Sequence, residues 1–235
     1  SHAMMSEGAE TKQPEGTPTE EAVNVALDEF KRLIAEAEAQ RGEEDPPLYP
    51  RRDDPFLRSF VVARKLDPAE ALTRFRNFSA WMHRHTDLAR GATLETDARP
   101  VVELNFSQLL RRGRARNGAR VSILTPSKFD PAAMGDGDVY ERMMRFNILS
   151  LPRLLDDPDL QNNGLYVVED FAGFSFRQGM RMQGIFSSHQ RKEMMSLMQG
   201  ILPIRLNGIV LVNQPWYVSL MLALYKPFMK KKLRE

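Results

Sequence analysis

Two adjacent carboxylates, Glu169 and Asp170, are the side chains of this sequence best placed for acid–base chemistry, because they end an apolar run with the pattern of a strand. Neighbouring residues on a strand point to opposite faces of the sheet, so we expect capping or hydrogen bonding rather than joint catalysis. Among the four histidines, His83 and His85 are two residues apart and do not share a helix face. We therefore expect no metal site.

The sequence lacks the signatures of the common enzyme classes. It contains no phosphate-binding Gly-x-x-x-x-Gly-Lys loop, no dinucleotide-binding glycine motif after a strand and no Gly-x-Ser-x-Gly elbow. The absence of cysteine excludes a thiol nucleophile, disulfide bonds and cysteine-based metal sites, and is typical of a reducing compartment such as the cytosol. The residues therefore predict neither an enzyme nor a resident cofactor.

Charge is distributed unevenly along the chain. Residues 1–50 carry 12 acidic and 4 basic side chains of the 31 and 33 in the whole chain, which leaves 19 and 29 for residues 51–235. The basic residues form two clusters, one in an expected loop and one near the end of the chain: Arg111, Arg112, Arg114, Arg116 and Arg120, and Lys226, Lys230, Lys231, Lys232 and Arg234. The first is either a phosphate-binding site or a solvated loop, and the second suits an anionic membrane surface. Neither cluster has the pattern typical of nucleic-acid-binding proteins, in which aromatic and basic residues alternate on a sheet or in a groove, so we expect no nucleic-acid partner.

The first ninety residues have the pattern of a small helical bundle. Residues 1–16 begin like the remnant of a tag and are expected to form a disordered leader. A capping box then opens a first helix, and the proline-rich residues 45–50 form a stiff linker. Asp54 and Asp67, each followed by proline, open two more helices with an apolar face. Residues 17–90 are therefore predicted to be a helical bundle.

From Arg120 onward, predicted strands alternate with predicted helices. The strands are expected at residues 121–124, 165–168 and 209–212, and the helices at residues 139–155, 176–184 and 189–201. Strands separated by helices indicate a parallel or mixed sheet with helices packed on it. The second half of the chain is therefore predicted to be α/β.

Residues 216–225 are unusual because nearly every position is apolar. One face of such a helix can cover a core, and the other must meet protein, an apolar ligand or lipid. Residues 208–225 carry no formal charge, but the polar corner at residues 213–215 predicts a buried strand followed by a helix rather than a membrane span. Flexible methionines suit either an adaptable pocket or core filling, and they cluster at Met180, Met182, Met194, Met195 and Met198.

Four runs of residues, taken in order, match one known family. Residues 53–67 are similar to the signature that opens its amino-terminal helical bundle, and Phe129-Asp130-Pro131 to a Trp-Asp-Pro corner. Residues 163–175 resemble its second core strand and the following turn. The most specific run, residues 203–217, ends in Gln-Pro-Trp-Tyr. Together these runs resemble the CRAL-TRIO lipid-binding family, in particular its retinaldehyde-binding and clavesin branch. The resemblance extends over about residues 17–235.

The resemblance implies an α/β fold in which a sheet with flanking helices encloses an apolar pocket, preceded by the helical bundle. Residues 91–235 would be the CRAL-TRIO lipid-binding domain, whose carboxyl-terminal end looks shortened, with a mobile gate helix at about residues 215–233. Glu169 would be the one polar pocket residue, bound to a ligand hydroxyl or carbonyl or protonated in an apolar wall. The pocket positions implied by the resemblance are Leu165, Glu169, Met194, Leu197, Met198, Ile204, Ile209, Trp216 and Leu220.

The resemblance also implies a basic patch that binds phosphoinositides at the membrane. Its residues would be Arg64, Arg205, Lys226, Lys230 and Lys232, while Asn207 stands where the family has a further arginine. The implied function is to bind a retinoid, tocopherol or other isoprenoid-like lipid in a gated cavity and to transfer it between membranes, with phosphoinositide-assisted release. The chain would be a cytoplasmic monomer peripheral to membranes, with endosomes as a candidate location, and the lipid would be its only bound small molecule.

Three alternatives remain open on the sequence. The first is a phosphoinositide-binding trafficking adaptor of the clavesin type that carries lipid only incidentally. The second is a hydrolase or isomerase that uses Glu169, although no nucleophile–base pair is visible. The third is an interaction domain with a packed core and no cavity.

Overall fold

The computed structural model describes residues 18–134 and 137–223. The amino-terminal part is helical, with α1 (Glu20–Ala39), α2 (Asp54–Ala63), α3 (Pro68–Arg84), α4 (Thr86–Ala89), the π-helical turn η1 (Leu94–Ala98) and α5 (Arg99–Glu103). The rest of the described chain has β1 (Ser107–Arg114), β2 (Arg120–Leu124), η2 (Pro126–Lys128), η3 (Pro131–Met134), α6 (Val139–Leu154), α7 (Pro158–Asn163), β3 (Leu165–Asp170), α8 (Phe176–Ile185), α9 (Ser188–Ser196), η4 (Leu197–Ile201), β4 (Leu206–Val212) and α10 (Trp216–Ala223).

Asp67 caps α3 as the sequence predicts, whereas the caps of α1 and α2, Thr19 and Asp53, lie two residues after the expected Thr17 and one residue before the expected Asp54. The side chain of Thr19 accepts a hydrogen bond from the Ala22 amide, and Asp53 accepts one from the Phe56 amide. Asp67 accepts bonds from two amides of the first turn of α3. Each cap satisfies amides that have no partner inside the helix, which is why Thr and Asp occupy these positions.

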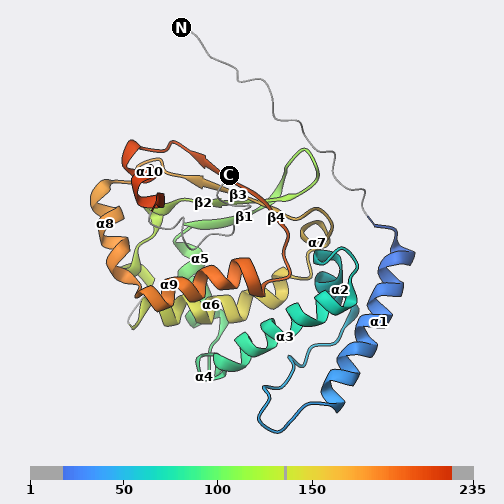
Figure 1. Ribbon diagram of the computed structural model, residues 1–235. Coiled ribbons are helices and arrows are strands. Elements are labelled where there is room, and N and C mark those ends of the chain that lie inside the picture. The colour runs from blue at the N-terminus through green and yellow to red at the C-terminus, as the bar shows by residue number, and fades with distance from the viewer. Residues whose placement is uncertain (1–17, 135–136, 224–235) are drawn as a thin grey trace.

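The four strands form one mixed sheet in the order β1-β2-β3-β4. β1 pairs antiparallel with β2, whereas β2, β3 and β4 are parallel. Figure 1 shows α6 and α9 beneath the sheet, with α3 beside them and α1 outermost. Leu165 and Val167 of β3 are buried against Leu160 of α7 and Leu154 of α6. The predicted α/β class, with a sheet and flanking helices, is confirmed.

One strand was not expected from the sequence. Residues 107–114 form β1, where the arginines at positions 111, 112 and 114 indicated a loop. The prediction of a loop is therefore wrong, because charged residues are tolerated on a strand whose side chains reach water. The exposed pattern of β1, an edge strand paired only with β2, fits this explanation.

The largest apolar cluster joins the bundle to the rest of the molecule. Its fully buried members include Phe30, Phe60 and Trp81 of the bundle together with Met144 of α6, and Leu197 of η4 is nearly as buried. The division between domains at residue 90 stays a prediction. The expected leader lies outside the described residues.

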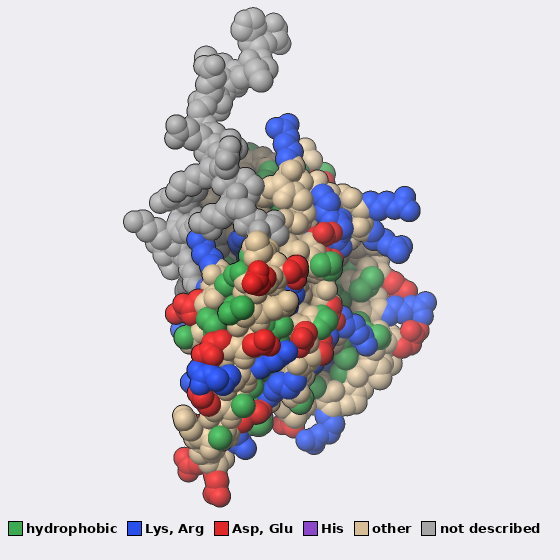
Figure 2. Space-filling view, turned by 90° about the vertical axis from the view of Figure 1, so that its right-hand side faces the viewer, with side chains coloured by type: hydrophobic (Ala, Val, Ile, Leu, Met, Phe, Trp, Pro, Cys, Tyr) green, Lys and Arg blue, Asp and Glu red, His purple; other side chains and the backbone are tan. Residues whose placement is uncertain are grey.

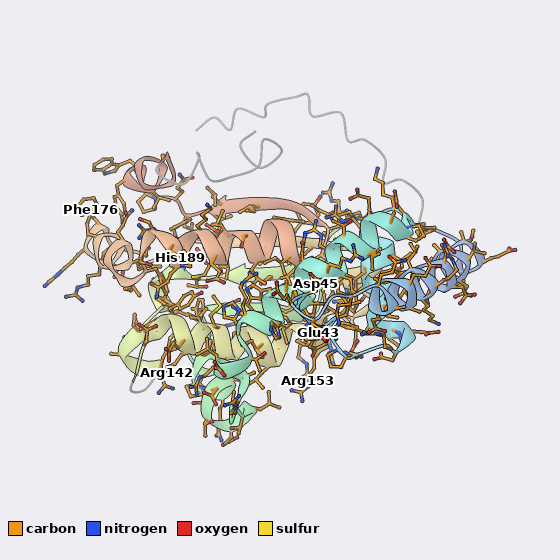
Figure 3. All side chains as sticks on the ribbon, turned by 60° about the horizontal axis from the view of Figure 1, so that its bottom comes forward. Glu43, Asp45, Arg142, Arg153, Phe176 and His189 are labelled. Carbon is orange, nitrogen blue, oxygen red and sulfur yellow. The ribbon has the colours of Figure 1, made fainter. Side chains whose placement is uncertain are left out.

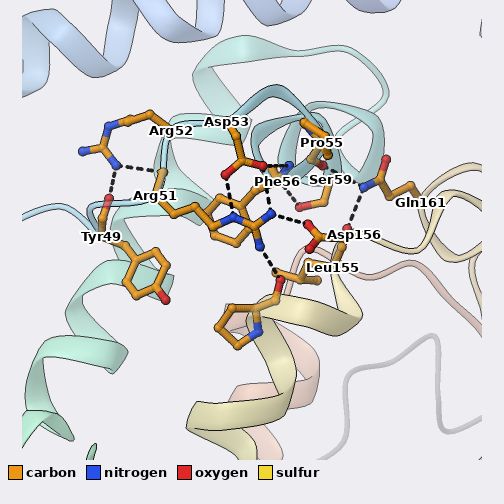
Figure 4. Close-up of polar contacts among 11 residues, drawn as sticks. Tyr49, Arg51, Arg52, Asp53, Pro55, Phe56, Ser59, Leu155, Asp156 and Gln161 are labelled. Atoms are coloured by element: carbon orange, nitrogen blue, oxygen red, sulfur yellow. Dashed lines mark hydrogen bonds and ion pairs between the residues drawn. The ribbon is translucent and has the colours of Figure 1, made fainter.

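Polar contacts also hold the bundle to the α6–α7 region (Figure 4). Arg51 donates to the backbone carbonyl of Pro152 at 2.8 Å and to the Asp156 carboxylate at 2.7 Å. The side-chain amide of Gln161 donates to the carbonyls of Pro55 and Leu155 at 2.8 and 2.6 Å. The bonds to Pro152, Pro55 and Leu155 give hydrogen-bond partners to backbone carbonyls at this junction.

A buried polar cluster links three helices. His85, at the end of α3, lies with Nδ1 2.8 Å from the Trp81 carbonyl and Nε2 3.2 Å from Oε1 of Glu193 in α9. The hydroxyl of Tyr140 in α6 donates to the other oxygen of Glu193. Burial and the Glu193 carboxylate raise the pKa of Tyr140, so this hydroxyl keeps its proton. The cluster therefore fixes α9 against the bundle and α6.

The surface in Figure 2, which faces right in Figure 1, has acidic and basic side chains interspersed. On α1, Arg32 forms ion pairs with Glu29 and Glu36, and Lys31 lies 2.6 Å from Asp54 of α2. This face therefore carries compensated charge. Within residues 18–134 and 137–223, no helix is long and apolar enough to cross a membrane.

Candidate functional site

A cavity of about 270 Å³ lies beyond the carboxyl ends of β2 and β3. Leu124 and Glu169 pair in register at these ends, so their side chains project from the same face of the sheet. In open α/β sheets, this edge is where ligands usually bind. The lining residues are Phe106, Leu124, Pro126, Phe129, Glu169, Phe171, Phe174, Gly179, Met182, Gln183 and Val218.

Helix α8 forms one wall of the cavity. Gly179, Met182 and Gln183 line it, and their spacing of three and four residues places them on one side of the helix. A capping box formed by Ser175 and Gln178 begins the helix. The Gln178 side chain also donates to the Ser127 carbonyl at 3.1 Å, which holds the start of α8 against η2.

The turn between β3 and α8 supplies an aromatic wall. The rings of Phe171 and Phe174 lie 5.6 Å apart, and both side chains are buried with Val218 of α10. The hydroxyl of Tyr217 donates to the Phe174 carbonyl. The first turn of α10 therefore packs on the cavity, as a helix with apolar residues on both faces would allow.

Glu169 is the one ionisable group of the lining among the described residues. Burial raises the pKa of its carboxyl above the usual range, and no hydrogen bond or ion pair joins it to any described residue. Asp170, its neighbour, accepts bonds from the Asn213 side chain at 2.8 Å and the Ala172 amide at 3.0 Å, and these bonds lower its pKa. The two adjacent carboxylates therefore differ: Asp170 holds the turn, and Glu169 is available to a ligand.

We expect Glu169→Gln to stabilise the ligand-free protein at pH 7. Because the raised pKa means that the folded state binds this proton more tightly than the unfolded chain, wild-type stability should fall as the pH rises above the ordinary carboxyl range. The difference between the two proteins should disappear below about pH 3.5, where the carboxyl is protonated in both states. Urea midpoints across this pH range measure it. A wild-type protein that gains stability relative to the variant as the pH rises would contradict the argument.

The predicted pocket residues are dispersed in the structure. Glu169 lines the cavity, and Leu165 and Ile204 pack in the apolar cluster under β3. Met194 and Leu197 pack in the large core. Three others are exposed, with exposed fractions of 43% for Met198, 38% for Ile209 and 81% for Trp216. Leu220 lies in α10, but its side chain is outside what the structure describes.

The predicted basic patch is only partly within the described residues. Arg64 follows α2, and its Nε is buried without a hydrogen-bond partner among these residues. Arg205 precedes β4, is exposed and donates to the Asn162 carbonyl at 2.6 Å. Lys226, Lys230 and Lys232 lie outside the described residues. The patch therefore stays a prediction.

Sequence reasoning missed most of the cavity lining. Phe171 and Phe174 follow a predicted strand directly, and the rule that ligands bind beyond the carboxyl ends of parallel strands could have identified them. Phe106 and Phe129 carried no such signal, because their contacts join segments far apart in the chain, and Met182 was one of five clustered methionines for which a pocket and a packed core were both open. Among the described residues, no group of three or more His, Cys, Asp or Glu side chains could hold a metal ion.

Comparison with known proteins extends these observations. The family model described as the CRAL/TRIO domain matches residues 109–235. Clavesin-1 of Rattus norvegicus is 27% identical over 185 residues, which is 79% of this chain and 50% of that protein. Clavesin-2 of Homo sapiens is 27% identical over 188 residues, or 79% of this chain and 54% of that protein. The chain thus spans about half the length of these curated relatives.

A solved structure shares the fold. The crystal structure of Sfh5 superposes with a TM-score of 0.56 at 15% sequence identity, covering 92% of this chain and 79% of that one. The family match covers more than half of the residues, including three of the four strands and all the described helices from α6 onward. The chain therefore belongs to the CRAL/TRIO family.

Proposed function

We propose that this chain binds one neutral, weakly polar lipid in the cavity beside Glu169 and exchanges it with anionic membranes. The observation that carries the proposal is the composition of the lining, in which Glu169 and Gln183 are the only polar side chains among the residues that the structure describes. An apolar cavity with few polar groups is typical of a site for a small hydrophobic ligand. Exchange of this kind makes and breaks no covalent bond.

The lining supports a lipid alcohol, aldehyde or ketone rather than a phospholipid inside the cavity. No Lys or Arg of residues 18–134 and 137–223 lines it, so a phosphate buried among these residues would lack a counter-charge. A protonated Glu169 can donate a hydrogen bond to a carbonyl, and an ionised Glu169 can accept one from a hydroxyl. Retinoids, tocopherols and other isoprenoid-like lipids have this chemistry.

The energetics permit release without an energy source. Covering about 400 Å² of ligand at roughly 25 cal/mol per Å² stabilises it by about 10 kcal/mol relative to water, before ordering costs. Relative to a bilayer the gain is far smaller, because the lipid there is already out of water. Contact with a membrane is therefore enough to shift the lipid out of the cavity.

The outer face of α8 suits contact with a membrane. Phe176 and Met180 are exposed there, and Tyr217 connects Phe176 to the exposed Trp216, with ring centroids 5.6 and 5.8 Å apart. Arg177 and Arg181 are also exposed on α8, and neither forms an ion pair with a described acidic residue. Figure 3 places Phe176 at the edge of the molecule, far from Glu43 and Asp45. Apolar side chains flanked by arginines are typical of an interfacial helix.

We expect Arg177→Glu/Arg181→Glu to weaken binding to phosphatidylserine-containing vesicles at least tenfold, because each basic residue near such a surface contributes about 1 kcal/mol. Cosedimentation with these vesicles and with phosphatidylcholine alone measures the effect. Arg76→Glu/Arg153→Glu, with the same change in charge at exposed sites elsewhere, is the matched control and should lose less. Equal losses in both double variants would contradict docking through α8.

Organic extraction of the purified protein, followed by mass spectrometry, tests the proposed ligand. A stoichiometric isoprenoid-like lipid is expected, and transfer of that lipid between vesicles should follow. A bound phospholipid would overturn the ligand class. A protein that binds phosphoinositide vesicles and contains no extractable lipid would favour the trafficking adaptor.

The finer parts of the proposal concern release and location. Phosphoinositides would assist release through Arg64, Arg205 and the carboxyl-terminal lysines, with α10 in the gate. The Nε of Arg64 is buried and has no hydrogen-bond partner among the described residues, which supports binding of an anion at this position. The protein would act in the cytoplasm at membrane surfaces, with endosomes as the candidate compartment.

A further inference from the structure

The linker between α1 and α2 is unusually rich in proline and lies on the surface. Residues 45–50 form neither helix nor strand, and Pro46, Pro47 and Pro50 are exposed. Proline restricts its own backbone and that of the preceding residue, which favours an extended polyproline conformation. Such segments bind in the aromatic-lined grooves of proline-recognition domains.

Two recognition patterns overlap in this linker. Residues 46–49 read Pro-Pro-Leu-Tyr, the Pro-Pro-x-Tyr pattern in which a WW domain takes the prolines in an aromatic groove and the tyrosine in a second pocket. Pro47, Pro50 and Arg52 have the Pro-x-x-Pro-x-Arg spacing of an SH3 ligand.

The contacts of Arg52 disfavour the SH3 pattern. Its guanidinium donates to the Tyr49 carbonyl (Figure 4). It also pairs with Glu38 of α1 and lies 5.2 Å from the centre of the Phe75 ring. An SH3 domain needs this charge for its own acidic pocket, whereas a WW domain does not. The Pro-Pro-x-Tyr pattern is therefore the better supported of the two.

Tyr49 is the one element of the Pro-Pro-x-Tyr pattern whose availability depends on the fold. Its amide donates to Oγ of Ser79 at 2.9 Å, and its ring lies 5.3 Å from Phe78 and 5.6 Å from Phe56. Its hydroxyl forms no hydrogen bond with a described residue, and burial raises its pKa. The ring is thus held against α3 while the prolines face solvent.

We propose that Pro46-Pro47-Leu48-Tyr49 is a docking motif for a WW domain, and that the packing of Tyr49 against α2 and α3 limits its availability. The WW domain binds the chain when the Tyr49 ring leaves Phe56 and Phe78. The apparent affinity is then the intrinsic affinity multiplied by the fraction of chains with the ring released. None of these residues lines the lipid cavity, so the inference is independent of the proposed function.

The test titrates the full chain with an isolated WW domain of the Pro-Pro-x-Tyr-binding class, by calorimetry. Saturable one-to-one binding is expected. Ser79→Ala should strengthen it about tenfold, because it removes the hydrogen bond to the Tyr49 amide and so raises the released fraction. Circular dichroism checks that this variant is folded.

Two substitutions separate the motif from its surroundings. Tyr49→Phe keeps the ring that packs in the bundle and removes the hydroxyl that the WW pocket reads, so it should abolish binding both alone and with Ser79→Ala. Pro47→Ala should abolish binding as well. Pro50→Ala is the matched control, because Pro50 belongs only to the SH3 pattern, and it should bind like wild type.

Three results would overturn the inference. One is the absence of binding by folded Ser79→Ala protein. Another is binding that survives Tyr49→Phe in that background. The third is loss of WW-domain binding in Pro50→Ala together with binding of the wild-type chain to an SH3 domain. This result would assign the linker to the other class of partner.

Discussion

Met182→Trp is expected to reduce bound lipid at least tenfold while leaving the protein folded. Met182 lines the cavity from α8 and packs beside the cluster of Phe171, Phe174 and Val218. The larger indole would occupy a substantial part of the 270 Å³ that the ligand needs. Because the side chain enters an open cavity rather than a packed core, the strain that normally accompanies overpacking should stay within about 1–3 kcal/mol. Extraction of lipid and titration with retinol as a fluorescent probe measure the loss.

Val25→Trp is the control for the size of the new side chain, since Val25 is 68% exposed on α1, far from the cavity. Lipid loading should match the wild type. Met198→Trp gives a sharper comparison, because Met198 is a pocket position implied by family resemblance but is exposed in the structure. If Met198→Trp empties the protein and Met182→Trp does not, the ligand lies elsewhere and the cavity beside Glu169 is not its site.

Glu193→Ala is expected to destabilise the protein by about 2–4 kcal/mol, the usual cost of leaving buried hydrogen-bonding partners unpaired. The carboxylate of Glu193 meets both Nε2 of His85 and the hydroxyl of Tyr140, and its side chain is only 16% exposed. Its removal would leave both groups without a partner at the junction of three helices. Urea denaturation followed by tryptophan fluorescence measures the change, because Trp81 stacks on His85 at 4.7 Å.

Lys192→Ala, at the preceding exposed position of α9, is the matched control and should change stability by less than about 0.5 kcal/mol. Tyr140→Phe alone should cost about 1–2 kcal/mol, since it removes one of the two contacts. Equal stabilities for Glu193→Ala and Lys192→Ala would show that the cluster does not hold α9 in place.

Much of the fold could be predicted because its signals are local. The caps at Thr19, Asp53 and Asp67 act within one helical turn, so the sequence shows to within two residues where α1, α2 and α3 begin. The apolar runs of β3 and β4 likewise identify two parallel strands between helices. β1 could not be found in this way, because its arginines obscure the alternation of apolar and polar residues that marks a strand. Its pairing with β2, which no local pattern shows, is what makes it a strand.

The candidate site was less predictable. Glu169 was singled out as one of two adjacent carboxylates at the end of an apolar strand, which is a local feature, and its place in the pocket was implied only by the family resemblance. The rest of the lining depends on register and packing: Leu124 meets Glu169 because β2 and β3 pair in parallel at that position. Trp216, implied to face the ligand, is 81% exposed, whereas Val218 of the same helix is 2% exposed. The direction in which α10 leaves the corner at residues 213–215 determines which of its side chains is exposed, and the spacing of apolar residues in the sequence does not predict that direction.

The fold class, the membership in the CRAL/TRIO family and the lack of cysteine can all be read from residue types and their order. Only the tertiary structure decided that Phe106, Phe171 and Met182 enclose one cavity with Glu169, and that the carboxyl groups of Glu169 and Asp170 have opposite shifts in pKa. The physical reason is that burial and desolvation depend on which distant segments meet. A sequence pattern specifies a helix face, but only packing determines what lies against it.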